Sequence, residues 1–465
     1  MTGDRINPMV VKELRQGLKS RGFVSALILG QLLMVFCMLV YFLILAQSPG
    51  RAGDLLGADI FFQAILALCL LVIVPAQACF SLSNERSQKT LELIQLTRLQ
   101  ARNIVLGKNI SLLLQSFLLY TAVMPFLVLR YFFGPMSVSG NIQIALGMVG
   151  LAVCLTGCGL WISSFTGKAT RYTLIALMFL HMLVLGVFLM ERLSYGSFSL
   201  TTLEVSLFAL FALAYARFYL WEAISRIAPV VENHTFRKRL ISLAMLLTIL
   251  VIFWFDPKEE FLFFMLILLT PMCMATLCEP DHPLAVLHMR PQKLSALAHV
   301  FRMPGFVSAS LFVSAIFLSV FLMGRLRVSP ISHHHYSYSV FVFAPVLLNV
   351  LLFPIPLLQW RNVPSENRML AYLIVQLACL ILGLMAMFLQ ETFWFSGDGP
   401  KAFFPMWAFF DVIDMGGSYF QLFSSWFFTC VFLGIILARP GRFRTVSSNP
   451  VPPPVHQNAE NTPPA

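Results

Sequence analysis

The chain has 465 residues, of which 58% are apolar and only 11% are charged. Soluble domains are about 25% charged, so this composition excludes a water-soluble protein, because too few polar side chains are present to cover its surface. The net charge of +11 would fit nucleic-acid binding by a soluble domain, but the loops of a membrane protein give another reason for basic residues, and we expect no nucleic-acid partner.

The residues before the first apolar run predict an amphipathic helix. Asn7 is a favourable N-cap, and Pro8 suits the first helical position. At 100° per residue, an arc of about 120° contains Val10, Val11, Leu14, Gly17 and Leu18. The opposite side contains Lys12, Arg15, Gln16 and Lys19. We therefore expect residues 1–22 to form a helix in the membrane interface, with its apolar side toward lipid and its basic side toward the headgroups.

The first long apolar run predicts a membrane-spanning helix. Of the 19 residues from Leu27 to Leu45, 13 are Leu, Ile, Val or Phe and none is charged. These 13 favour insertion by roughly 4–8 kcal/mol, and the run is longer than the core of a signal peptide. Twelve such runs follow one another, near 23–46, 59–82, 109–129, 142–164, 172–190, 205–221, 240–255, 261–278, 305–324, 337–359, 369–390 and 416–438. The fold class predicted is all-α, a polytopic membrane bundle of about 12 helices.

Basic residues predict how these spans are oriented. With the N-terminus in the cytoplasm, 25 of the 32 Lys and Arg residues fall in cytoplasmic segments or at the inner ends of spans. The outer side then has only seven, namely Arg51, Arg130, Arg192, Lys258, Arg325, Arg327 and Lys401. Since basic residues concentrate on the cytoplasmic side, we expect both termini in the cytoplasm and a multi-pass protein of the plasma or inner membrane.

The cytoplasmic loop between the second and third runs has an apolar ridge among charged residues. The ridge consists of Leu91, Leu93, Ile94 and Leu96, and it is flanked by Glu85 and Glu92. Thr97 and Gln100 form a capping box that starts a new helix leading into the third run. This pattern predicts a short projecting helix that joins rigidly to a span, an arrangement suited to transmitting a push from a soluble partner.

Motifs of soluble enzymes are absent from the sequence, which has no GxxxxGK[ST], HExxH or GxSxG. We therefore predict no catalytic, cofactor or metal site on this chain. His181 in the fifth run is interpreted as a packed histidine rather than a proton relay, and His333–His335 as a solvated outer loop. With so few ionisable groups in the spans, energy is expected to come from a partner rather than from ion coupling.

Over about residues 5–190, the chain resembles the permease subunits of ABC-2-type ATP-binding-cassette exporters. The resemblance depends on Asn7-Pro8 with Lys12-Glu13-Leu14-Arg15, on Glu85-Arg86 with Thr90-Leu91-Glu92-Leu93, and on Arg102 to Lys108. It implies that the first segment is an elbow helix, with Asn7, Pro8, Lys12, Glu13 and Arg15. The resemblance also implies a coupling helix docking on an ABC ATPase through Glu85, Arg86, Thr90, Leu91, Glu92, Leu93 and Thr97. ATP and Mg would bind to that partner.

The resemblance and the spans together predict the domain organisation and the function. The segments are 1–22 (elbow helix), 23–221 (transmembrane domain with coupling segment 84–102), 222–239 (cytoplasmic linker), 240–438 (second transmembrane half) and 439–465 (Pro-rich disordered tail). The expected function is a non-enzymatic transport subunit that exports a substrate using ATP hydrolysed elsewhere. The alternative is a membrane scaffold or sensor that only assembles with an ATPase. Whether the second half is a diverged permease, and whether two copies pair, stay open.

Overall fold

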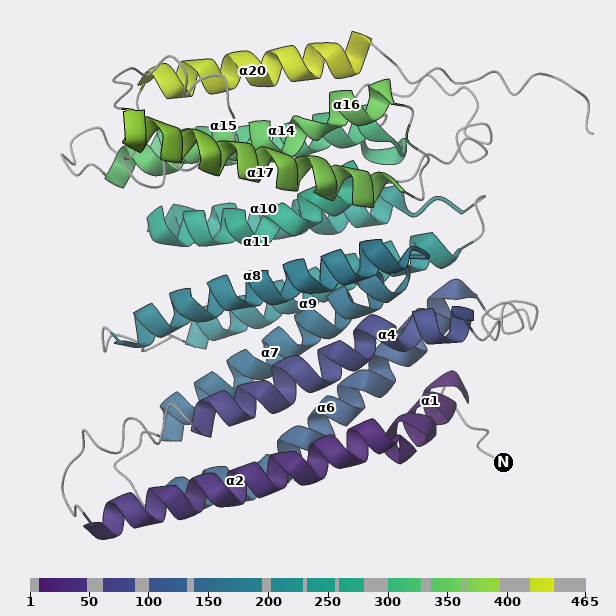
Figure 1. Cartoon of the computed structure of the whole chain (residues 1–465), viewed down its shortest axis with the longest axis vertical. Coiled ribbons are helices and arrows are strands. Elements are labelled where there is room, and N and C mark those ends of the chain that lie inside the picture. Colours follow the sequence, from purple (N-terminus) through teal and green to yellow (C-terminus); the bar gives the residue numbers. More distant parts are fainter. Residues whose placement is uncertain are drawn as a thin grey trace, which may run out of the picture.

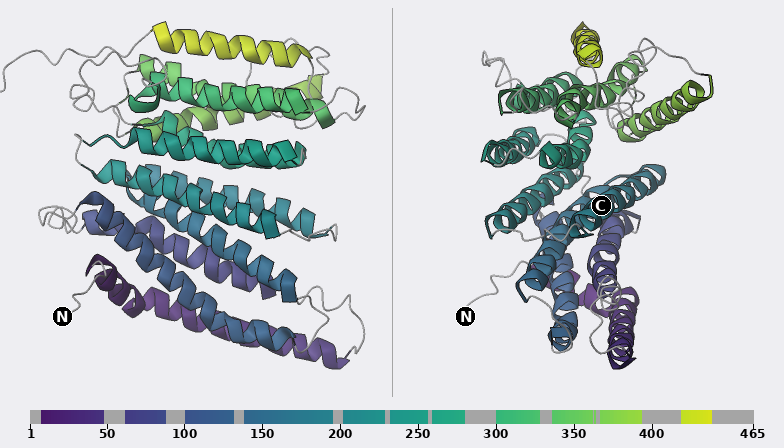
Figure 2. Two further views of the ribbon diagram at one scale, coloured as in Figure 1. Left: turned by 180° about the vertical axis from the view of Figure 1, so that it is seen from behind. Right: turned by 90° about the vertical axis from the view of Figure 1, so that its left-hand side faces the viewer.

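The computed structural model describes residues 8–47, 62–87, 100–131, 138–194, 202–228, 232–255, 259–279, 300–327, 336–361, 363, 367–393 and 419–438. Within these ranges the regular structure is entirely helical, so the predicted all-α class is confirmed. Long helices lie side by side and follow one another along the longest axis, from α2 at one end to α20 at the other (Figures 1 and 2).

The helices of the first half are α1 (Pro8–Lys19), α2 (Arg21–Gln47), η1 (Leu68–Ile73), α4 (Val74–Ser87), α6 (Ala101–Tyr131), α7 (Val138–Ser163), α8 (Lys168–Ser194) and α9 (Thr202–Ile227). Those of the second half are α10 (Thr235–Phe255), α11 (Glu259–Leu277), α14 (Phe306–Arg327), α15 (Tyr336–Leu352), α16 (Pro354–Trp360), α17 (Arg368–Phe393) and α20 (Tyr419–Ala438). The predicted linker 222–239 is divided between the end of α9 and the start of α10.

The described residues of each predicted apolar run are largely helical. The run near 23–46 lies within α2, for example, and that near 369–390 lies within α17. The run near 337–359 forms two helices, α15 and α16, because Pro354 has no N–H to continue the hydrogen bonding of the first. Prolines inside α6, α11 and α15 leave those helices unbroken.

Among the residues that the structure describes, four helical segments are long and apolar enough to cross a membrane. They are Arg21–Ile44, Phe62–Ser87, Ala101–Phe126 and Phe306–Met323. On the first of them, large apolar side chains are more than half exposed, including Ile28, Leu29, Leu32, Val35, Phe36 and Leu39. A surface of this kind suits contact with lipid rather than water. The shorter apolar segments among the described residues are Gly147–Ser163, Ala344–Trp360, Arg368–Leu382 and Ser425–Ala438.

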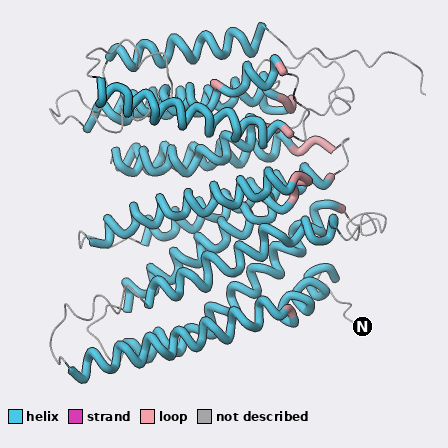
Figure 3. The backbone as a smooth tube through the Cα atoms, viewed as in Figure 1, coloured by secondary structure: helices cyan, strands magenta, loops and turns pink. Residues whose placement is uncertain are grey.

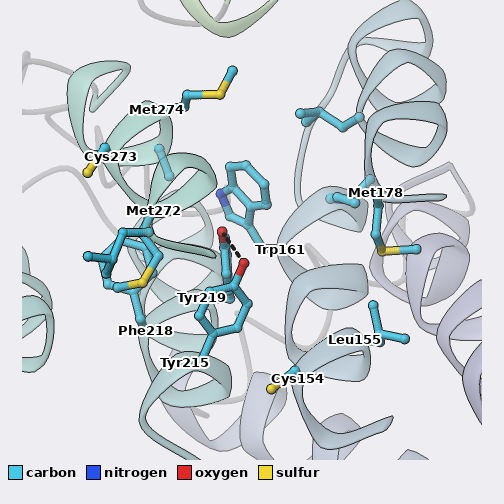
Figure 4. Packing of buried hydrophobic residues seen from close by; sticks show 14 of the residues in the cluster. Cys154, Leu155, Trp161, Met178, Tyr215, Phe218, Tyr219, Met272, Cys273 and Met274 are labelled. Atoms are coloured by element: carbon cyan, nitrogen blue, oxygen red, sulfur yellow. Dashed lines mark hydrogen bonds between the residues drawn. The ribbon is translucent and has the colours of Figure 1, made fainter. Parts of the chain in front are cut away.

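Close packing at the centre of the first half depends on a glycine. Helix α7 packs against both α4 and α9. A Cβ added to Gly159 would lie 2.8 Å from the Cβ of Ala78 and 3.0 Å from the carbonyl oxygen of Pro75. Such contacts between small residues let helix backbones approach closely where no hydrophobic force brings them together. Around α7 and α9 is a buried cluster to which α8 and α11 also contribute, with Trp161, Met178, Tyr219 and Met272 (Figure 4).

One end of the bundle contains the described turns between consecutive long helices, including 164–167, 232–234 and 303–305 (Figure 3). The same end contains α1, the C-termini of α4, α9 and α11, and the N-termini of α6, α10 and α14 (Figure 1). We refer to it as the α1 end. Side chains predicted to be cytoplasmic, such as those of Glu85, Arg86 and Lys108, lie at this end, which therefore contains the candidate site.

Candidate functional site

The structure describes part of the predicted docking surface and elbow. Glu85 and Arg86 lie in the last turn of α4, and Pro8 begins α1. Lys12 and Arg15 are exposed on α1, whereas Glu13 is partly buried. The remaining predicted residues lie outside the described residues, namely Asn7, Thr90, Leu91, Glu92, Leu93 and Thr97.

Three charged side chains join the elbow helix to both ends of the coupling segment. Lys108, on the second turn of α6, is only 3% exposed. Its Nζ lies 2.9 Å from Oε2 of Glu13 on α1 and 2.9 Å from Oε1 of Glu85 on α4. We call these three residues the N-terminal ion cluster. A buried ammonium between two carboxylates fixes the relative positions of three helix ends.

Part of the apolar side of α1 faces protein. Met9 and Val10 are buried, and α1 packs along the start of α6. Gly107 makes this approach possible, since a Cβ there would lie 3.0 Å from Cγ of Met9. Val11 stays 46% exposed. The helix predicted within residues 1–22 therefore spans Pro8–Lys19 in the described part of the chain. Contrary to the expectation that its apolar side faces lipid, Met9 and Val10 are buried in the protein and only part of that side is left open.

Two arginines near the ends of the coupling segment connect it to other helices. Nη1 of Arg86 donates to the carbonyl oxygen of Ser164, 3.0 Å away, in the turn between α7 and α8. Cζ of Arg102, at the start of α6, lies 5.9 Å from the ring centroid of Trp221 on α9. The same indole is 4.7 Å from Cζ of Arg237 on α10. Trp221 is therefore contacted by arginines from both halves of the chain.

A second group of charged residues, the central ion cluster, consists of Glu222, Lys238, Arg239 and Glu279. All four side chains are at most 4% exposed. Nζ of Lys238 donates to Oε1 of Glu222 at 2.8 Å and also forms an ion pair with Glu279. Nη2 of Arg239 donates to Oε2 of Glu279 at 3.1 Å. Glu222 belongs to α9, the two bases to α10, and Glu279 follows α11, so the cluster connects three helices.

Glu279 also receives hydrogen bonds from outside the cluster. Oγ1 of Thr235 donates to its carboxylate at 2.8 Å, and Nη1 of Arg368, at the start of α17, donates to its carbonyl oxygen at 3.3 Å. Arg239 reaches onward to Oγ of Ser308 on α14, 3.2 Å away. Glu279, which follows α11, therefore contacts the starts of α10 and α17 directly and is connected to α14 through Arg239.

Opposite charges within the central ion cluster favour the charged forms of Glu279 and Lys238. Burial alone would raise the pKa of Glu279, but Lys238 and Arg239 outweigh it, and the pKa of this carboxyl lies below its usual value. Burial would likewise lower the pKa of Lys238, yet Glu222 and Glu279 raise it above the usual value. Glu279 and Lys238 are therefore both ionised across the neutral pH range. The stability that comes from these two shifts is lost only in strong acid, as Glu279 is protonated, or in strong base, as Lys238 loses its proton.

The histidines that the sequence analysis singles out are placed as follows. No group of three or more His, Cys, Asp or Glu residues within the described ranges could hold a metal ion. His333–His335 lie outside the described residues. Nε2 of His181 is buried and has no hydrogen-bond partner in the described part of the chain, so the packed histidine that was predicted lacks a bond at this atom.

The sequence did not predict the central ion cluster. Lys238 and Arg239 were counted only as positive residues of a cytoplasmic loop, and Glu222 and Glu279 received no role. A signal was present, because these acidic and basic residues stand at the inner ends of consecutive apolar runs, where helix ends meet. Burial and pairing could not be deduced from it, since they depend on which helices are neighbours.

Comparison with known proteins finds no match for this chain among family models, curated proteins or solved structures.

Proposed function

We propose that this chain is the membrane-spanning permease subunit of an ABC-2-type exporter, which moves its substrate with ATP hydrolysed by a separate nucleotide-binding subunit. The observation that supports the proposal best is the N-terminal ion cluster. In it the elbow helix, the helix that leads into the coupling segment and the helix that leads out of it are joined through Lys108.

This arrangement suits a segment that receives force. Residues 84–102 begin on α4 and end on α6, and the Glu85–Lys108 pair holds these two helices together on either side of the segment. Helix α6 then continues without interruption for 31 residues, from Ala101 to Tyr131. A rigid helix passes displacement at one end to the other. In the proposal, Glu85 and Arg86 fix the base, and Thr90, Leu91, Glu92 and Leu93 contact the ATPase.

The proposal includes the membrane topology. All twelve apolar runs cross the bilayer, and the α1 end faces the cytoplasm of the cell membrane. Supporting this orientation, Arg86, Arg102, Lys108, Lys238 and Arg239 all belong to the α1 end, as expected where positive residues stay inside. ATP and Mg bind to the partner, and no cofactor binds to this chain.

Affinity purification of the chain from its native membrane tests the function. We expect an ABC ATPase to co-purify with the chain. The lipids and small molecules recovered with the complex are then added back one at a time, and we expect the transported substrate among them to raise the rate of MgATP hydrolysis. If none of the recovered compounds changes the rate of MgATP hydrolysis by the complex, the result would favour the scaffold or sensor alternative. Purification without any ATPase would contradict both.

A further inference from the structure

Contacts between the two halves of the chain are formed by α9 against α10 and α11 and by α8 against α17. Many of the side chains buried in this region are apolar, as in the cluster of Figure 4. In a membrane, apolar burial gives little net drive to bring helices together, because lipid tails are as apolar as the side chains. Specific association of the halves therefore needs close packing and polar contacts.

The central ion cluster supplies a polar contact that crosses between the halves. Glu222 belongs to the first half, is 1% exposed, and has Lys238 of the second half as its ion-pair partner. Its other oxygen, Oε2, has no hydrogen-bond partner among the described residues. A buried carboxylate with a single ion-pair partner is strongly destabilised when that partner leaves. Separation of α9 from α10 would create such a carboxylate.

The neighbouring residue adds a second contact of the same kind. Trp221 precedes Glu222 on α9, and its indole is contacted by Arg237 and, with ring centroids 5.3 Å apart, by His234. Both belong to the start of the second half. Arg102 of the first half, the last residue of the coupling segment, also contacts this indole.

We infer that Glu222 and Lys238, with Trp221 beside them, form a clamp that fastens the second half to the first at the α1 end, independently of the covalent connection between the halves. The central ion cluster extends the clamp from Lys238 through Glu279 to the starts of α14 and α17. The two halves then behave at this end as one mechanical unit. This inference does not depend on the identity of any partner.

The test uses the full-length chain with a recognition site for a specific protease inserted after residue 230, which lies outside the described residues. The purified, folded protein is cut, captured through a C-terminal tag, and the N-terminal fragment retained with it is measured. We expect the wild-type fragments to stay together. Glu222→Lys should lower retention at least tenfold, because two ammonium groups would face each other, and adding Lys238→Glu should restore it. Arg217→Glu, an equal change of charge at an exposed position of α9, should have no effect.

A milder variant keeps the test decisive where Glu222→Lys fails to accumulate in the membrane. Glu222→Gln preserves the shape of the side chain and removes its charge, and we expect it to lower retention at least threefold. Wild-type fragments that separate on cutting would overturn the inference. So would either variant of Glu222 that retains its fragment at the wild-type level, or a charge swap that restores nothing.

Discussion

Replacing Glu92 with Arg together with Leu93 with Asp is expected to abolish co-purification of the ATPase while leaving membrane insertion unchanged. The two residues lie in the apolar ridge with flanking acidic residues that the sequence predicts as the docking surface. The double variant reverses a charge and places a carboxylate in the contact. Like charges facing each other, and a charge buried without a partner, each cost several kcal/mol in an interface, so the loss of affinity should exceed a hundredfold.

The measurement is the amount of ATPase recovered with the tagged chain. Lys168→Glu is the control, because it also reverses a charge, at an exposed residue where α8 begins, and it should leave recovery unchanged. Wild-type recovery with the double variant would show that residues 84–102 are not where the ATPase binds.

Lys238→Met is expected to lower the stability of the protein strongly. Glu222 and Glu279 would remain buried at 1% and 3% exposure, and Glu222 would lose the ion-pair partner that lies 2.8 Å from its carboxylate. Removing one partner from a buried ion pair costs about 3–5 kcal/mol, because the other charge is left uncompensated. Denaturant unfolding of the purified protein measures this loss. Lys168→Met, at an exposed position, should change the free energy of unfolding by less than about 0.5 kcal/mol. A Lys238→Met loss as small as the control's would mean that the central ion cluster contributes nothing to stability.

The helices were predictable from the sequence because membrane spans are specified locally. An uninterrupted apolar stretch such as Leu27–Leu45 has few alternatives to a helix in lipid, and it lies within α2. The division at Pro354 was less evident, since Pro125, Pro271 and Pro345 stay inside unbroken helices. Whether a proline interrupts a helix depends on what neighbouring groups satisfy the freed carbonyl, which a single stretch of sequence does not specify.

The ion clusters could not be predicted, because pairing depends on which helix ends are adjacent. Glu85 was assigned to a partner's surface, yet within the chain it pairs with Lys108, 23 positions along the sequence. Glu13 and Lys108 are farther apart still and meet because α1 packs on α6 beside Gly107. A sequence shows the charges at the inner ends of spans, but only the packed bundle shows which of them are neighbours.

In-cell photo-crosslinking from residue 92 tests most directly whether this chain receives its energy through residues 84–102. A photoreactive amino acid in place of Glu92 is expected to form a covalent adduct with a nucleotide-hydrolysing subunit. The same group in place of Leu39, on the exposed apolar surface of α2, should form none. Adducts from residue 92 that contain no nucleotide-hydrolysing protein, in cells where the chain is fully inserted, would contradict the proposed exporter.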